Sequence, residues 1–231
     1  MGLDERKKLI LSIIIKEHIR TGAPVGSGIL ADKYDLNISP ATIRNDMAEL
    51  ERDGLIIQPH TSAGRIPSEA GYLWHVNNIK DKRINKREEE ILRKVLGRFQ
   101  ETDFKNTAKV LAKFSGNAVF WAFHRNNLYY TGISNLLSQP EFSRLDLVFD
   151  VSAIIDQLDE IIPDIFNSLK EGEQTIIGSA NPFANFCGTV LSKYKHKDQT
   201  GIFGIIGPMR MNYEKNMGLV KFVNDKISNL N

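Results

Sequence analysis

The chain has 231 residues, 42% of them hydrophobic and 25% charged, which excludes fibrous and disordered classes and leaves room for two globular domains. The formal net charge is +2, and residues 1–80 carry ten basic and ten acidic side chains, so charge alone neither indicates nor excludes nucleic-acid binding. One cysteine, no signal-peptide pattern and no apolar run of 18 residues predict a cytoplasmic protein with no membrane partner.

The first predicted elements are two helices of unequal length. Isoleucines recur on one face from Asp4 to Arg20, which predicts a core helix that residues 21–24 terminate. Ser27 has the side-chain oxygen of an N-cap, so a short second helix is expected over Gly28–Tyr34. The polar residues 35–38 then predict a turn.

A third helix is predicted to begin at Pro40, because Ser39 is a favourable N-cap and proline is tolerated at the first helical position. Its apolar residues form one stripe and leave the opposite side free. Small and hydrogen-bonding side chains near the start of such a helix suit insertion into a DNA major groove. The expected DNA-contacting residues of this recognition helix are Ser39, Pro40, Ala41, Thr42, Arg44, Asn45, Ala48 and Glu49.

The residues after this helix predict the wing of a winged helix-turn-helix domain. Gly54 ends the helix, Leu55–Gln58 is expected to form a strand, and Pro59–Gly64 is expected to form a loop. Donors in and after this loop suit phosphates or a minor groove. The wing residues expected to contact DNA are His60, Thr61, Ser62 and Arg65.

Ser68 is expected to cap a fourth helix that closes the first domain, assigned to residues 1–80. The charged run 81–90 is interpreted as a linker or the start of a helix. Residues 91–231 are assigned to a second, regulatory and dimerisation domain. Two amphipathic helices open it, and their apolar faces are expected by default to form the core of this domain. The alternative is a dimer contact, for which Ile91, Leu92, Val95 and Phe99 are the predicted residues.

The rest of the second domain has mixed periodicity. Strands are predicted at Ala118–Phe123 and Leu128–Thr131 around an Asn126-Asn127 turn, and helices, with Ile154 and Ile155 on one of them, between Glu141 and Lys170. Three further strands and a final helix follow, at 174–178, 189–194, 201–206 and 212–229. The predicted fold class is therefore α+β.

Several motifs resemble those of the HrcA family of heat-inducible transcription repressors. They include S-P-A-T-I-R-N-D-M-A-E-L-E from Ser39, S-N-L-L-S-Q-P-E-F from Ser134 and G-I-F-G-I-I-G-P-M-R-M-N-Y from Gly201. The resemblance implies a winged-helix domain followed by a GAF-like domain. It also implies a homodimer that binds an inverted-repeat operator before chaperone operons of the groE and dnaK type and depends on a GroEL-type chaperonin.

The chain departs from the family in length. Members usually have about a hundred further residues, with an inserted dimerising domain between the equivalents of Phe123 and Tyr130, where this sequence has room for a tight hairpin only. The resemblance therefore leaves the manner of dimerisation open, although the residues expected to contact DNA lie outside the gap.

The sequence has no pattern typical of an enzyme, but it is compatible with two further classes of binding protein. The five histidines have no metal-ligand spacing, and no nucleophile elbow or phosphate-binding glycine loop occurs, so neither an enzyme nor a cofactor is predicted. A winged helix joined to a GAF-like domain is also compatible with a ligand-sensing regulator of other genes. A winged helix that contacts protein or RNA is the third alternative.

Overall fold

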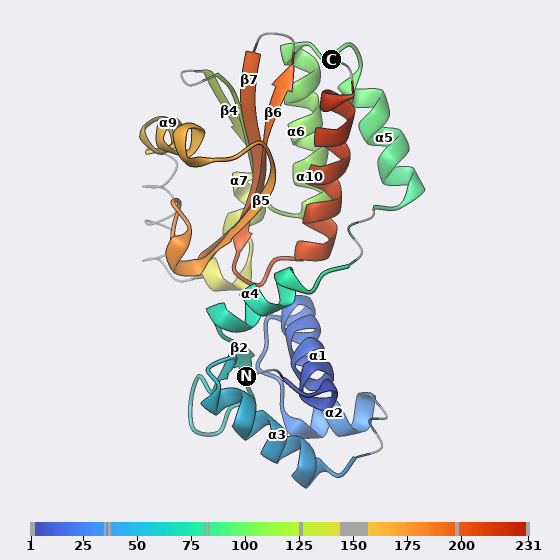
Figure 1. Ribbon diagram of the computed structural model, residues 1–231, viewed down its shortest axis with the longest axis vertical. Helices are drawn as coiled ribbons and strands as arrows, with labels where there is room; N and C mark the ends of the chain where they lie inside the picture. The colour runs from blue at the N-terminus through green and yellow to red at the C-terminus, as the bar shows by residue number, and fades with distance from the viewer. Residues whose placement is uncertain are drawn as a thin grey trace. The chain divides into compact units, whose positions relative to one another are not determined.

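The computed structural model describes residues 3–34, 36, 38–80, 82, 84–124, 127–143, 157–196 and 199–229. The chain divides into two compact units, Met1–Ile79 and Lys80–Asn231 (Figure 1). The first is a winged helix-turn-helix and the second an α+β unit, which confirms the predicted fold class.

Helix α1 (Glu5–Thr21) is the centre of the first unit, packed against α2, α3, α4 and β2. Asp4 caps its start by accepting a hydrogen bond from the Lys7 amide at 2.8 Å. Gly22 ends it with a left-handed φ of 69°, a conformation that glycine adopts without steric cost. Buried apolar side chains line most of α1: Ile10, Leu11, Ile13, Ile14 and Ile15.

Helix α2 (Ser27–Lys33) starts one residue earlier than predicted. The Gly26 carbonyl accepts the first helical bond, from the amide of Leu30, so Gly26 and not Ser27 occupies the N-cap position. The predicted capping role of Ser27 is therefore wrong, since a glycine cap offers no side-chain oxygen. Of the predicted turn that follows, Asp35 and Asn37 lie outside the described residues.

Helix α3 (Pro40–Arg52) confirms the predicted start of the recognition helix. Ser39 is the N-cap, its Oγ accepts from the Thr42 amide at 3.1 Å, and Pro40 occupies the first turn. Its buried stripe packs against α1 and α2: Ile43, Asp46, Met47 and Leu50. The helix-turn-helix thus presents the opposite side of α3 to solvent.

The wing is a two-stranded antiparallel ribbon of β1 (Ile56–Ile57) and β2 (Ile66–Pro67). The strand predicted over Leu55–Gln58 is shorter because the Gln58 amide instead closes the loop, donating to the carbonyls of Thr61 and Ala63 at 3.0 Å. Helix α4 (Glu69–Asn77) follows, with the Ser68 Oγ accepting from the Gly71 amide as the predicted cap. Tyr72 anchors α4 through its hydroxyl, 2.6 Å from His18 Nδ1 of α1.

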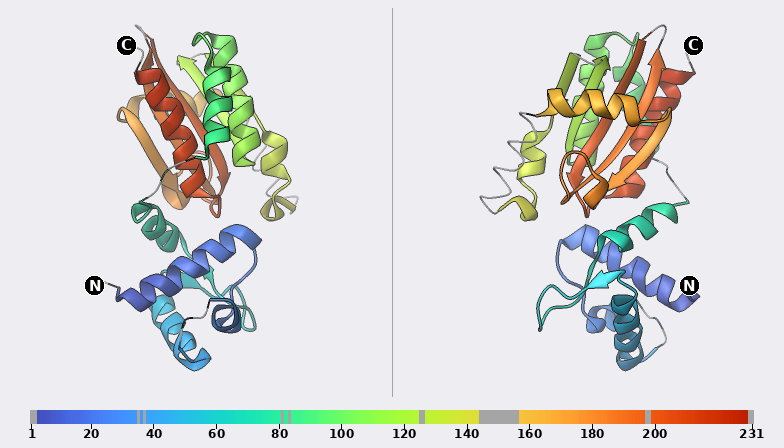
Figure 2. Two further views of the ribbon diagram at one scale, coloured as in Figure 1. Left: turned by 90° about the vertical axis from the view of Figure 1, so that its right-hand side faces the viewer. Right: turned by 60° about the vertical axis from the view of Figure 1, so that its left-hand side comes forward.

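The second unit is a five-stranded antiparallel sheet of order β4-β3-β7-β6-β5 with helices on both faces (Figure 2). The strands are β3 (Ala118–His124), β4 (Asn127–Thr131), β5 (Gly172–Ile177), β6 (Cys187–His196) and β7 (Gln199–Pro208). The helices are α5 (Lys86–Leu96), α6 (Glu101–Ser115), α7 (Ile133–Leu137), α9 (Leu158–Ser168) and α10 (Tyr213–Ser228), with 3-10 turns η1 (Pro140–Ser143) and η2 (Gly178–Ala180).

Helices α6 and α10 cover one face of the sheet (Figure 1). Aromatic side chains form the core on this face. Trp121 of β3 stacks on Phe203 and Phe104 with ring centroids 4.5 and 5.0 Å away, and its indole N–H donates to the Tyr194 hydroxyl at 2.8 Å. The one polar end of the tryptophan is thus satisfied, which makes its complete burial favourable.

Helix α9 covers the other face (Figure 2). The hydrophobic core beneath it includes Phe120, Leu191 and Ile202 from the sheet. Lys193 of β6 fixes the C-terminal end of α9, because the ammonium donates to the carbonyls of Phe166 and Leu169 at 2.8 and 3.1 Å. A cation at a helix C-terminus satisfies carbonyls that lack helical partners.

Most predicted elements of the second unit can be compared with the structure, but some predicted residues lie outside the described part of the chain. The strands and the final helix are confirmed in number and order, with longer strands than predicted. Asn127 lies in β4 and pairs with His124, whereas Asn126 of the predicted turn lies outside the described residues. Ile154 and Ile155, expected on a helix, also lie outside them.

Candidate nucleic-acid interface

The solvent-facing side of α3 consists of small and hydrogen-bonding side chains. Ala41, Arg44, Asn45 and Ala48 are exposed, as are Ser39 and Pro40 at the helix start. Thr42 is half-buried, and its hydroxyl lies 2.9 Å from Ser39 Oγ. Alanines at both ends of this face permit close approach of a groove wall, while Asn45 and Arg44 present amide and guanidinium groups suited to base edges or phosphates.

Two ion pairs fix α3 to the start of α1. The Arg6 guanidinium donates two hydrogen bonds to the Asp46 carboxylate, at 2.7 and 2.9 Å, and Asp46 is only 3% exposed. Lys7 pairs with Glu49 beside it. Glu49, expected on the DNA face, is thus half-buried and engaged with α1, because a lysine 42 residues earlier in the sequence reaches its carboxylate.

The wing is fastened to the rest of the unit by Arg65. Its backbone forms an antiparallel bridge with Val25 through two hydrogen bonds of 2.8 and 2.9 Å, and its guanidinium pairs with Glu51 of α3 at 2.9 Å. The Arg65 guanidinium is therefore engaged with α3, and its contact with DNA stays a prediction. His60, Thr61 and Ser62 are exposed at the tip of the loop, as a wing contact requires.

A cleft of about 390 Å³ opens between α3 and the wing. Residues from the start of α2, from α3 and from the wing loop line it: Gly26, Ser27, Arg44, Met47, Gln58, Ser62, Ala63, Gly64 and Arg65. Since Arg65 is paired with Glu51, the exposed guanidinium of Arg44 supplies the positive charge available to a bound anion. Arg44 of α3 and Ser62 of the wing loop, which are distant in the sequence, thus lie on the same surface.

A buried carboxylate joins α1 to α2 behind this surface. Glu17 is 5% exposed and accepts hydrogen bonds from Arg20 at 2.7 Å, Lys33 at 2.6 Å and the Tyr34 hydroxyl. These donors, Arg20 first, lower the pKa of Glu17 to about 2. This cluster was not predicted from the sequence, although a glutamate on the otherwise apolar face of α1 was the available signal.

The predicted dimerisation residues differ in how deeply the second unit buries them. Leu92 is fully buried within the second unit, where α5 packs on α6 and α10, so its assignment to a partner surface is wrong. Ile91, Val95 and Phe99 are half-buried, and Phe99 lies 6.3 Å from the Phe104 ring. Amphipathic spacing identified a packing face, and the chain itself covers most of that face.

The described part of the chain contains no group of three or more His, Cys, Asp or Glu side chains that could hold a metal ion. The same residues include no helix that is both long and apolar enough to cross a membrane. Cys187 is fully buried, and burial raises the pKa of its thiol to about 12.

Comparisons with known proteins place this geometry in a family. Residues 34–69 match the DeoR-like helix-turn-helix domain, and residues 73–217 match the HrcA protein C-terminal domain. A crystal structure described as that of a hypothetical protein has the same fold, with a TM-score of 0.79 and 16% identity over 99% of this chain and 98% of that chain.

Two heat-inducible transcription repressors named HrcA illustrate the sequence relationship. The protein of Carboxydothermus hydrogenoformans is 29% identical over 335 residues, covering 99% of this chain and 98% of that protein. The protein of Desulforamulus reducens is 38% identical over 68% of this chain and 47% of its own length. Because the first alignment spans 335 positions and this chain has 231 residues, at least 104 positions have no counterpart here. The chain, a transcription repressor with a DNA-binding helix-turn-helix, belongs to the HrcA family.

Proposed function

We propose that this repressor binds an inverted-repeat operator upstream of heat-shock chaperone genes, of the groE and dnaK type, as a homodimer. The observation that supports sequence-specific binding most directly is the exposed face of α3 beside the cleft. Arg44 and Asn45 lie together and exposed on that face, and alanines flank them. Bidentate contacts from Asn to adenine and from Arg to guanine are the chemistry such a face offers.

The ion pairs behind α3 support the same proposal. A base contact is specific only when the helix that carries it is held in one orientation, because a small displacement loses bidentate geometry. Arg6–Asp46 and Lys7–Glu49 hold α3 from α1, while Arg65–Glu51 holds the wing to α3. The recognition helix and the wing tip are therefore presented as one rigid surface.

The proposal of a dimer rests on the weak DNA binding expected of a single winged helix, which is small and has no net charge. A single module buries a limited surface on DNA, and ten acidic side chains offset ten basic ones in residues 1–80. Two linked copies raise the effective concentration of the second contact and match the two-fold symmetry of an inverted repeat. Of the three half-buried residues in the predicted surface, Phe99 lies against Phe104 of the same chain, so Ile91 and Val95 remain for a partner.

Fluorescence anisotropy with labelled DNA from upstream of this organism's chaperone genes tests the proposal. Asn45→Ala and Arg44→Ala are expected to weaken operator binding by about 1–3 kcal/mol each and random-duplex binding far less. Asn77→Ala and Arg98→Ala, exposed residues of the same types away from the cleft, serve as matched controls. Equal losses on operator and random duplex would reject base reading, and preference for RNA or for no nucleic acid would favour an interaction module.

Light scattering tests the dimer separately. Val95→Asp is expected to lower the dimer fraction and operator affinity together, and Lys94→Asp, the exposed neighbour on α5, is the control. Leu92→Asp is unsuitable because a buried charge there would unfold the unit. A monomeric wild-type chain that still binds the full inverted repeat tightly would contradict the homodimer.

We further propose that a GroEL-type chaperonin promotes the active state. The sheet order β4-β3-β7-β6-β5 pairs β3 with β7, which lies about 80 residues later, so the central pairing is strongly non-local and slow to form. Refolding with chaperonin and ATP is expected to raise the operator-binding fraction above that from spontaneous refolding. Equal active fractions in both reactions would contradict the chaperonin requirement.

A further inference from the structure

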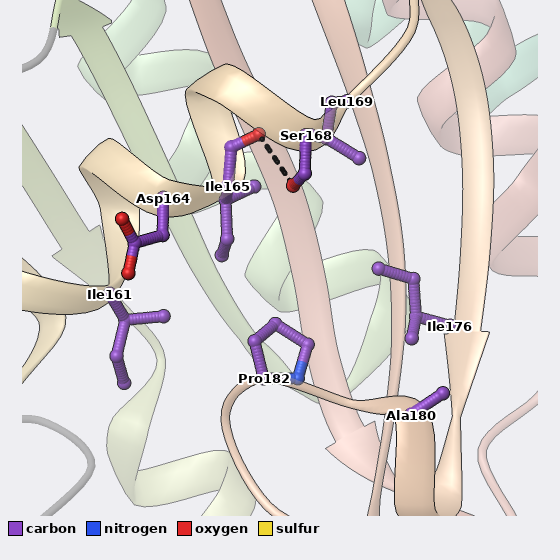
Figure 3. A pocket seen from close by; sticks show the side chains of 8 residues that line it. All are labelled: Ile161, Asp164, Ile165, Ser168, Leu169, Ile176, Ala180 and Pro182. Carbon is purple, nitrogen blue, oxygen red and sulfur yellow. Dashed lines mark hydrogen bonds between the residues drawn. The ribbon is translucent and has the colours of Figure 1, made fainter.

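The second unit contains an apolar groove that the DNA-binding proposal does not use. It lies between helix α9 and the segment from β5 through η2, and its volume is about 290 Å³ (Figure 3). Eight residues line it: Ile161, Asp164, Ile165, Ser168, Leu169, Ile176, Ala180 and Pro182. Ile161 and Ile165 of α9, with Leu169 directly after the helix, face Ile176, Ala180 and Pro182 across it (Figure 3).

The polar groups of this groove are few and distinct. Ser168 donates its hydroxyl proton to the Ile165 carbonyl of its own helix at 3.3 Å. Asp164 is exposed on α9 near one end of the groove, and it is the one charged residue among the described residues that line the groove (Figure 3). The nearby ammonium of Lys193 is directed to the carbonyls of Phe166 and Leu169, at the other end of α9. The groove is therefore apolar along its length with a negative charge at one end.

The size and the charge together restrict what can bind. A volume of about 290 Å³ lies at the small end of ligand sites, and it is too small for a folded peptide helix. Apolar walls give water few hydrogen bonds, so an apolar ligand group gains by replacing it. A carboxylate at the rim favours a cation and repels an anion.

We propose that this groove binds a small amphiphilic amine, a cationic ammonium group on a short aliphatic chain or ring. The ammonium group pairs with the Asp164 carboxylate, and the apolar part lies between α9 and the β5–η2 segment. Binding there adds a bridge between α9 and the edge strand β5, which stabilises the second unit by mass action.

Methyl NMR of the full chain, labelled at isoleucine δ1 methyl groups, tests this site directly because Ile161, Ile165 and Ile176 all line it. The probe is n-hexylammonium, with 1-hexanol and hexanoate as neutral and anionic analogues of similar length. Saturable shifts are expected at those three isoleucines, with hexanol binding about fivefold more weakly, as for a solvent-exposed ion pair, and hexanoate more weakly still.

Two variants and one control complete the experiment. Asp164→Asn is expected to remove the preference for hexylammonium over hexanol, whereas Glu160→Gln, an exposed carboxylate on the same helix outside the groove, leaves it intact. Ala180→Leu is expected to abolish binding by filling the groove. Non-saturable shifts, shifts spread over isoleucines such as Ile10 and Ile227, or equal binding of hexanoate would overturn the proposal. Asp164→Asn changes an exposed side chain, so the test does not depend on Ala180→Leu remaining folded.

Discussion

The pair Arg6–Asp46 predicts an asymmetric response to mutation. Asp46 is 3% exposed and Arg6 is its bidentate donor at 2.7 and 2.9 Å, while the Arg6 side chain is 50% exposed. Arg6→Ala leaves a buried carboxylate without this donor, whereas Asp46→Ala leaves an arginine that solvent can hydrate. Removing the exposed partner is therefore expected to cost more than removing the buried one.

The magnitude follows from the same geometry. A hydrogen bond to a charged group contributes about 1.5–3 kcal/mol, and an exposed ion pair about 0–1 kcal/mol. Because one partner is buried and the other half-exposed, we expect a cost of about 2 kcal/mol for Arg6→Ala and about 1 kcal/mol for Asp46→Ala. Lys8→Ala, which removes the exposed Lys8–Glu5 pair, is the control and is expected to cost under about 0.5 kcal/mol.

Hydrogen exchange in the α3 amides measures these costs in the full chain. A loss of about 2 kcal/mol corresponds to roughly 30-fold faster exchange of the amides that open only by unfolding of the first unit. The double variant should cost less than the sum of the two single variants, by a coupling energy of about 1–2 kcal/mol. A coupling below about 0.3 kcal/mol, or an Arg6→Ala effect no larger than that of Lys8→Ala, would refute the assigned role of the pair.

Three further predictions concern other parts of the chain. Glu17 has a folded pKa of about 2 and an ordinary pKa of 4.5, so its contribution to folding stability is complete above about pH 4.5 and is lost as the pH falls toward 2. Acid unfolding monitored by circular dichroism should therefore show a weaker pH dependence of stability in this range for Glu17→Gln. Gly64→Ala should loosen the wing and weaken DNA binding, because a Cβ there would lie 2.4 Å from the Val25 carbonyl carbon, whereas Gly28→Ala, with no atom within 4 Å, should be mild; equal affinities would contradict this. Cys187 should react with a thiol reagent only at the rate of unfolding of the second unit, since it is fully buried with a raised pKa, and fast labelling of the native chain would refute that burial.

Local signals in the sequence were sufficient for much of the fold. The capping of α3 by Ser39, with Pro40 after it, involves residues within one helical turn, so the side chain and the amide it accepts from are specified together. Alternating and helical periodicities likewise identified the five strands and the final helix of the second unit. The exposed face of α3 followed from the same periodicity, because its apolar stripe is continuous and its opposite side is polar or small.

Pairings between distant segments required the tertiary structure. Periodicity distinguishes a buried from an exposed side of a helix, but it does not say which charge on another element will lie opposite. Arg65 and Glu49 therefore read as available DNA contacts, although Glu51 and Lys7 engage them. Leu92 was predicted to contact a partner subunit, although it is buried where α5 packs on α6 and α10 of the same chain. Lys193, an unremarkable residue within a strand, caps α9 because the sheet brings it beneath carbonyls of residues 166 and 169, and only the folded chain brings those groups together.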